Sequence, residues 1–229
     1  MNIALIPARM GSQRLKKKNL RLVGGVSLIA RAIRKCRQAD CFDEIWVNSE
    51  DTEFGAIADA EGVSFHLRPA ELGNNVATSE QYVTEFLQVH ECDRVFQVHT
   101  IAPLLSVGSI RGFVEEAGKG EWDCLLSVEN IQLECIYDGR PVNFDFARKT
   151  NSQELKPVQR ICWSITGWRR AAFLDAAARG ECATYAGKVG FFALDPLESH
   201  VIKTERDLRI ADALLPLCEA HTDNSGVSS

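Results

Sequence analysis

A cluster of basic residues follows the first apolar segment of the chain. Arg9, Arg14 and Lys16 to Lys18 place five positive charges within ten residues. Gly11, between the two arginines, permits a tight turn, and successive backbone N–H groups in such a turn form a nest for an anion. Arg grips a phosphate through two donors, and Lys acts as a point charge. The pattern predicts a site for the phosphates of a nucleotide; the alternative is a basic loop in solvent.

Other residues of this kind lie later in the chain. His99 ends an apolar segment, where it can contact a substrate carboxylate, act as a base, or simply bond to the backbone. Arg160 is a candidate for gripping a sugar carboxylate. Glu205 and Asp207 are either metal ligands or, as we favour, acids in the first turn of the last helix.

Several site classes are excluded by what the sequence lacks. It has neither G-x-x-x-x-G-K-[ST] nor G-x-G-x-x-G, which excludes a P-loop kinase and a standard dinucleotide site. None of the eight cysteines forms a C-x-x-C pair, and no His stands at zinc-ligand spacing. The net charge of −5 gives no general attraction to nucleic acid or to anionic membranes. We expect reduced thiols and a cytoplasmic location, and neither nucleic acid nor membrane as a partner.

The apolar periodicity predicts the elements that must hold these residues. Strands are expected at 2–7, 44–49, 63–67, 94–99, 123–128, 188–194 and 199–202. Helices are expected at 27–38, 51–60, 78–89, 107–117, 168–178 and 204–215. A β-hairpin is expected at 134–144, turning at Asp138-Gly139.

Alternating strands and helices predict an α/β fold with a doubly wound, mainly parallel sheet. With 229 residues we expect one domain over 1–229, with an inserted hairpin and loop region at about 130–160 and a frayed tail at 217–229. Ligands of such sheets bind at the carboxyl ends of the strands. The loops at 8–25, 68–79 and 99–106 should therefore meet.

Three motifs and a late segment give the chain a resemblance to a known family. They are IPAR-x-GS-x(5)-KN from Ile6 to Asn19, LRPAEL from Leu67, ATS from Ala77, and VGFFALDPLESHVIKTERDL from Val189. From Ile3 to about Leu215 the chain resembles the acylneuraminate cytidylyltransferases, which join a sugar acid to CTP and release pyrophosphate. The resemblance implies a Rossmann-like nucleotidyltransferase fold and a homodimer, with the hairpin as the dimerisation extension.

The resemblance also implies roles for individual residues. Arg9, Ser12 and Lys18 match the family's contacts to the triphosphate, and Asn19 lies where its loop meets the nucleotide. Arg68 opens the family's R-P-A-E-L beside the nucleotide, and Ala77 and Ser79 match the small residues that read the cytosine edge. The remaining expected nucleotide-binding residues belong to the same loop: Ala8, Gly11, Gln13 and Arg14.

The chain departs from the family pattern at several positions. Gln13 stands where the family has Lys, a cation that the neighbouring Arg14 can replace. His99 and Leu105 replace a Gln that faces the sugar and an Arg. Val201 and Lys203 replace two aspartates that hold Mg²⁺ in the family, and neither can bind a hard cation.

Three consequences stay open. The Lys203 ammonium can stand in for the metal, Mg²⁺ can be carried by the CTP phosphates rather than by protein aspartates, or the reaction can be lost. We expect a cytidylyltransferase that joins CTP to an acidic sugar, with Arg9, Lys18, His99 and Lys203 as catalytic residues and His99 and Arg160 on the sugar. The alternatives are another NTP or a sugar phosphate, or an inactive nucleotide-binding homologue.

Overall fold

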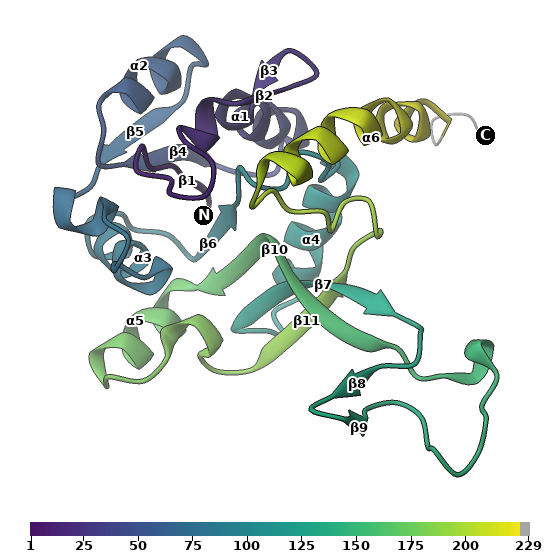
Figure 1. Cartoon of the computed structure of the whole chain (residues 1–229). Coiled ribbons are helices and arrows are strands. Elements are labelled where there is room, and N and C mark those ends of the chain that lie inside the picture. Colours follow the sequence, from purple (N-terminus) through teal and green to yellow (C-terminus); the bar gives the residue numbers. More distant parts are fainter. Residues whose placement is uncertain (225–229) are drawn as a thin grey trace.

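The computed structural model describes residues 1–224 and is built around one seven-stranded sheet (Figure 1). The strands follow the spatial order β11-β7-β10-β6-β1-β4-β5. Their bounds are β1 (Asn2–Pro7), β4 (Glu44–Ser49), β5 (Ser64–Leu67), β6 (Arg94–Val98), β7 (Cys124–Ile131), β10 (Val158–Arg169) and β11 (Val189–Ala193). Two short hairpins pair β2 (Leu22–Val23) with β3 (Val26–Ser27), and β8 (Ile136–Tyr137) with β9 (Arg140–Pro141).

Six α-helices accompany the strands of the described chain. They are α1 (Leu28–Ala39), α2 (Glu53–Ala60), α3 (Ser79–Val89), α4 (Val107–Gly118), α5 (Arg170–Ala178) and α6 (Glu205–Asn224). Short 3₁₀ helices lie at Lys18–Leu20, Ala70–Gly73, Ser152–Glu154 and Ala183–Tyr185. Within residues 1–224, no helix combines the length and the apolar character that crossing a bilayer requires.

The sheet is mainly parallel, as predicted. β1 pairs in parallel with β4 and β6, β4 with β5, and β7 with β11. β10 is the exception, because it lies antiparallel between β6 and β7. The predicted α/β fold class is confirmed, and the antiparallel strand is an addition to it.

Three of the expected elements need correction. Strand β10 is absent from the predicted elements, and the helix predicted to begin at Trp168 begins instead at Arg170, because Trp168 lies in β10. The strand expected at 199–202 is wrong: this segment is irregular, and its Ile202 amide donates to the Ile101 carbonyl at 2.8 Å. The last helix continues to Asn224, so residues 217–224 are helical rather than frayed, while 225–229 lie outside the described residues.

The core lies on both faces of the sheet. Alternate residues of β1 point to opposite faces, so Ala4 and Ile6 pack in one apolar cluster and Ile3 and Leu5 in the other. The first cluster contains residues of α1, α2 and α4, and the second contains residues of α3 and α5. Strand β1 is therefore buried on both faces, and this fixes the position of the residues that follow Pro7 at the carboxyl end of the strand.

The predicted hairpin is confirmed, and it extends away from the sheet as an arm (Figure 1). Asp138 and Gly139 have φ values of 48° and 71°, as a tight two-residue turn between antiparallel strands requires. Large apolar side chains are exposed along this arm: Leu133, Ile136, Tyr137, Val142 and Phe146.

Candidate active site

A cavity of about 310 Å³ lies where β1 and β6 end. It is lined by the loop after β1, by residues 68–82, and by the start of the loop after β6, which are the three loops predicted to meet. Nine of the predicted site residues line it: Ala8, Arg9, Ser12, Lys18, Asn19, Arg68, Ala77, Ser79 and His99.

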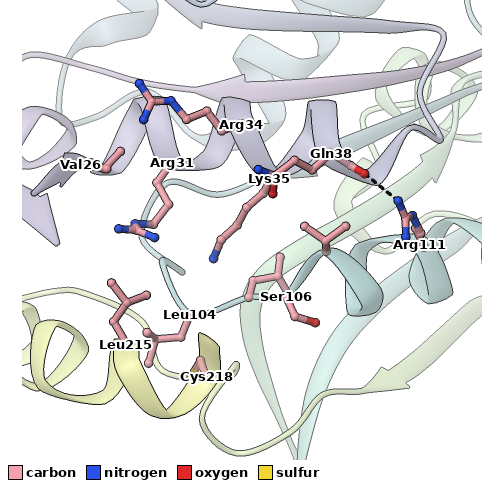
Figure 2. Close-up of a pocket in the computed structure, with 12 residues that line it drawn as sticks. Val26, Arg31, Arg34, Lys35, Gln38, Leu104, Ser106, Arg111, Leu215 and Cys218 are labelled. Carbon is pink, nitrogen blue, oxygen red and sulfur yellow. Dashed lines mark hydrogen bonds between the residues drawn. The ribbon is translucent and has the colours of Figure 1, made fainter. Parts of the chain in front are cut away.

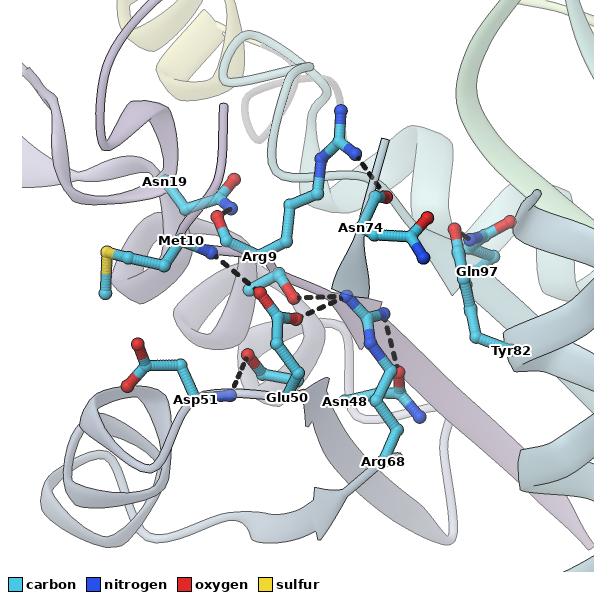
Figure 3. Close-up of polar contacts among 12 residues, drawn as sticks. Arg9, Met10, Asn19, Asn48, Glu50, Asp51, Arg68, Asn74, Tyr82 and Gln97 are labelled. Carbon is cyan, nitrogen blue, oxygen red and sulfur yellow. Dashed lines mark hydrogen bonds and ion pairs between the residues drawn. The ribbon is translucent and has the colours of Figure 1, made fainter. Parts of the chain in front are cut away.

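Arg68 is buried beneath this cavity and fixes the backbone of the loop after β1 (Figure 3). Its Nη2 donates to the Ala8 carbonyl at 3.0 Å and to Glu50 Oε2 at 2.7 Å, and its Nη1 donates to Asn48 Oδ1 at 2.9 Å. Glu50 in turn accepts the Met10 N–H at 3.1 Å. Arg68 and Glu50 thus fix the backbone on either side of Arg9, at Ala8 and Met10. The main role of Arg68 in this structure is to hold the loop in place.

A second set of bonds ties the same loop to its neighbours. Arg9 Nη1 donates to the Asn74 carbonyl at 2.9 Å, and the Asn74 side chain accepts the N–H groups of Val76 and Ala77. Asn19 is buried; it donates to the Arg9 carbonyl at 3.0 Å and accepts from Thr100 Oγ1 at 2.7 Å. The side-chain amide of Asn19 therefore joins this loop to the loop after β6.

The nest of backbone N–H groups is smaller than predicted. The Met10 amide is taken by Glu50, and the Ser12 amide donates to the Met10 carbonyl at 2.9 Å. Gly11 has no left-handed φ, and a Cβ built on it would meet no atom within 4 Å. The fold itself does not require glycine there, so the open space beside Gly11 is available to a ligand.

Lys18 and His99 set the electrostatics of the cavity. Burial lowers the pKa of the Lys18 ammonium, and the charges of Arg9 and Arg14 lower it further. Burial, assisted by the charge of Lys18, also lowers the pKa of the His99 imidazole to about 4. His99 is therefore neutral at physiological pH, and its buried Nε2 has no hydrogen-bond partner among residues 1–224. That nitrogen has almost no accessible surface, so it is not the part of the ring that is open to the cavity.

Tyr82 in α3 is a cavity residue that sequence reasoning missed. The Arg68 guanidinium lies 4.8 Å from the centre of its ring, and Gln97 Nε2 donates to its hydroxyl at 2.5 Å. Burial raises the pKa of this phenol to about 12, so it stays protonated. Its spacing on α3 is that of a core residue, and no sequence signal separated it from Val83 and Phe86.

Five predicted residues do not line the cavity: Gly11, Gln13, Arg14, Arg160 and Lys203. The first three belong to the same loop as Arg9. Arg160, in β10, is paired with the carboxylate of Glu129 and donates to Ser199 Oγ at 3.3 Å. Lys203 is exposed, although the preceding residue, Ile202, accepts a hydrogen bond from Lys18 Nζ at 3.5 Å.

The residues near Lys203 do not form a site for Mg²⁺. Asp207 Oδ2 accepts the backbone amides of Lys203 and Thr204 and the Thr204 hydroxyl, at 2.8–3.0 Å, and so caps α6. Glu205 forms an ion pair with Arg21. In the part of the chain that the structure describes, no group of three His, Cys, Asp or Glu residues is arranged to hold a metal ion.

A larger cavity, of about 520 Å³, lies between α1, α4 and α6 (Figure 2). Arg31 and Lys35 project into it from α1 toward Leu104 and Leu215 (Figure 2). The loop after β6 lines both cavities, but none of the predicted site residues lines the larger one. The smaller cavity is therefore the candidate active site. We choose it because the predicted site residues converge there, although the other cavity is larger.

The chain is similar in sequence to known cytidylyltransferases. A family model described as Cytidylyltransferase matches residues 3–156. N-acylneuraminate cytidylyltransferase of Escherichia coli is 35% identical over 88 residues, which are 38% of this chain and 21% of the relative. N-acylneuraminate cytidylyltransferase B of Danio rerio is 22% identical over 220 residues, 91% of this chain and 50% of the relative. The chain thus spans half or less of the length of these curated relatives.

Among solved structures, the fold is similar to that of a CMP:2-keto-3-deoxy-manno-octonic acid synthetase complexed with CTP. The TM-score is 0.68 at 17% identity, and the match covers 94% of this chain and 98% of that one. The 4-diphosphocytidyl-2C-methyl-D-erythritol synthase of Anaerococcus prevotii has a TM-score of 0.66 at 14% identity, over 94% of this chain and 96% of that one. At these identities the likeness concerns the fold.

Proposed function

Because the chain belongs to the cytidylyltransferase family, we propose that it transfers the cytidylyl group of CTP to an acidic sugar of the nonulosonic acid type. A hydroxyl oxygen of the sugar attacks the α-phosphorus, the bond to the bridging oxygen of the β-phosphate breaks, and pyrophosphate leaves. The observation that carries the proposal is the convergence of nine predicted site residues from three separate loops on one cavity.

The basic side chains of the cavity support the binding of the triphosphate. Arg9 and Lys18 bring positive charge, and the Ser12 hydroxyl brings a hydrogen-bond donor, to the end of β1. These groups lie in a partly buried site, where charges act more strongly than in water. Charge that develops on the leaving pyrophosphate would be stabilised by them. Ala77 and Ser79, which also line the cavity, are the proposed contacts of the cytosine.

His99 is proposed to hold the sugar. Its low pKa argues against an ion pair between an imidazolium and the sugar carboxylate, and it makes the imidazole a weak base. A neutral ring can still form a hydrogen bond with the attacking hydroxyl through an atom that faces the cavity, and so orient it. Arg160 and Lys203 would join the site only if the sugar draws them from their present positions.

Mg²⁺ is proposed to enter, if it is needed, on the phosphates of CTP. The carboxylates beside Lys203 are committed to capping α6 and to an ion pair with Arg21, and residues 1–224 offer no ready ligand set for the metal. Mg²⁺ keeps several waters when it binds and needs few protein ligands.

A homodimer is proposed on the exposed apolar side chains of the β8–β9 arm. Large apolar side chains that are exposed together on one arm are typical of an interaction site. Light scattering should give twice the chain mass for the wild type. A Tyr137→Glu, Phe146→Asp double variant should give a monomer, and a monomeric wild type would contradict the dimer.

The test of activity is the release of pyrophosphate from CTP with N-acetylneuraminate and with 2-keto-3-deoxy-manno-octonic acid as acceptors. Release that requires an acceptor, and is lost in Lys18→Gln, supports the proposal. No release with either acceptor, while CTP raises the melting temperature more than the other NTPs, would favour the second candidate. That candidate is a nucleotide-binding protein without turnover, and the replacement of the family aspartates by Val201 and Lys203 favours it.

A further inference from the structure

Strand β10 carries a large bulge opposite Ser127 of β7. Ile161 pairs with Val128 and Thr166 pairs with Leu126, so residues 162–165 all lie opposite the single residue Ser127. Trp163 adopts a left-handed φ of 58°, which an L-residue with a bulky side chain rarely does. A strained backbone of this kind persists only where the surrounding contacts hold it.

Ser127 supplies those contacts. Its side chain is buried, and its Oγ accepts the backbone N–H groups of Ser164 and Ile165, each at 3.2 Å. The Cys162 thiol also donates to it, at 3.4 Å. The bulge removes these backbone groups from the ladder with β7, and a buried N–H without an acceptor is costly. One serine oxygen thus replaces the ladder bonds that the bulge breaks.

The bulge also changes which face of the sheet each residue meets. Ile161 and Trp163 pack with one apolar cluster, whereas Ile165 belongs to the other. In a regular strand, residues 161, 163 and 165 would share a face, because the side-chain period is two. The bulge therefore sets the orientation of β10 where it runs beside β6.

Ser164, at the centre of the bulge, bonds to the candidate active site on one side and to the segment before Val201 on the other. Its carbonyl accepts the backbone N–H of His99 at 3.1 Å. Its hydroxyl donates to the Glu198 carbonyl at 3.2 Å, and the Glu198 carboxylate accepts from the Ser106 amide and the Ser109 hydroxyl at the start of α4. The bulge thereby joins His99 to the segment that carries Val201 and Lys203.

We infer that Ser127 is a positioning residue for the acceptor side of the reaction: it holds the β10 bulge, and through Ser164 it fixes His99 in the cavity. The inference rests on the proposed function, because it needs His99 to hold the sugar. Among residues 1–224, the hydrogen-bond partners of the Ser127 side chain do not line the cavity, so Ser127 acts on His99 only through Ser164.

The triphosphate side of the cavity is held by a different set of contacts. Arg9 and its flanking residues are braced by Arg68, Glu50 and Asn19, and none of these bonds to the bulge within the described chain. Loss of the Ser127 hydroxyl should therefore weaken use of the acceptor and spare the binding of CTP.

The experiment compares pyrophosphate release and CTP binding in Ser127→Ala and the wild type, with N-acetylneuraminate and 2-keto-3-deoxy-manno-octonic acid as acceptors. We expect kcat/KM for the acceptor to fall about 10- to 100-fold, as a small misplacement of a substrate contact does, with the Kd of CTP within about threefold of wild type. Ser127→Thr, which keeps the hydroxyl, should restore most of the loss. A matched control is Thr166→Val, since the buried Thr166 Oγ1 has no hydrogen-bond partner in residues 1–224.

Unchanged acceptor kinetics in Ser127→Ala, or an equal loss in Thr166→Val, would overturn the inference. An equal weakening of CTP binding and acceptor use would also overturn it, because it would indicate a general structural role. Should Ser127→Ala not fold, Ser127→Cys, with its weaker sulfur acceptor, replaces it and should show a smaller loss of the same kind.

A second readout does not depend on turnover. The ring resonances of His99, assigned among the five histidines by His99→Gln, report its surroundings by NMR. They should shift in Ser127→Ala and stay in place in Thr166→Val. If the wild type releases no pyrophosphate but the His99 signals shift in this way, the proposed function fails while the link from Ser127 to His99 stands. If the signals do not move, the link itself is refuted.

Discussion

Replacement of Arg68 by Ala tests whether the loop after β1 is held from below. Arg68 and Glu50 form an ion pair at 2.7 Å, and their side chains are only 2% and 15% exposed. Arg68→Ala removes the cation and leaves the Glu50 carboxylate in a mostly dry position. It also removes the donor to the Ala8 carbonyl, which precedes Arg9. Both stability and nucleotide binding should therefore suffer.

The magnitude follows from the burial of the pair. Breaking a buried ion pair by removing one partner costs about 3–5 kcal/mol, because the remaining charge has no compensation. A domain of this size loses about 2–4 °C of melting temperature per kcal/mol, so a fall of roughly 6–20 °C is expected. Since whole domains are stable by only about 5–15 kcal/mol, this single change removes a large share of the free energy of unfolding.

The assay is urea unfolding at pH 7, with CTP binding measured by calorimetry on the folded variants. Arg68→Met combined with Glu50→Gln removes both charges, and it should cost less than the sum of the two single changes. Arg34→Ala is the matched control, because Arg34 pairs with Glu61 through three hydrogen bonds at the surface and should matter much less. A loss below about 1 kcal/mol in Arg68→Ala, or additivity in the double variant, would refute the argument.

Three further predictions concern the cavity. The pKa of the His99 imidazole is about 4 in the folded protein and 6.5 in the unfolded chain, so unfolding between these pH values takes up a proton. The stabilisation from the neutral ring is therefore fully present above pH 6.5, and at most about 3 kcal/mol of it is lost on acidification to pH 4. His99→Gln should lack this loss when the free energy of unfolding in urea is measured against pH. Lys18→Gln should raise the Kd of CTP about tenfold or more by calorimetry, and Arg14→Gln, outside the cavity lining, by clearly less; equal effects would contradict the assignment. Asn19→Ala leaves the Arg9 carbonyl and the Thr100 hydroxyl without their partner and should cost about 1–3 kcal/mol of stability; a neutral result in thermal unfolding would mean that water replaces the amide.

The parts of the fold that sequence could predict are those with local signals. Strands β1 and β4 are short apolar runs, and α1 shows its core positions at helical spacing, so their bounds were predicted within a residue. Strand β10 has no such signal. Its bulge at Trp163 reverses the face that successive side chains meet, so a period of two never appears over its length. For this reason the antiparallel strand was not predicted, and the helix α5 was expected to begin two residues too early.

The candidate site divides in the same way. The motif and the α/β pattern predicted which loops meet. They did not predict that the Arg68 guanidinium forms hydrogen bonds within the protein, because the register of β4 against β5 is what brings Glu50 and Asn48 next to it. Tyr82 was missed because a residue on the core side of a helix carries no mark of the cavity it also lines.

The position of β10 between β6 and β7 also affects how the chain folds during synthesis. The first four strands of the sheet to be made, β1, β4, β5 and β6, are neighbours and can assemble at once, but β10 leaves the ribosome roughly 60 residues after β6. At about 5–20 residues per second, the edge of β6 stays open for about 3–12 s, and an unpaired edge invites pairing with another chain. We therefore expect misassembly of nascent chains to begin at β6, the strand that His99 directly follows.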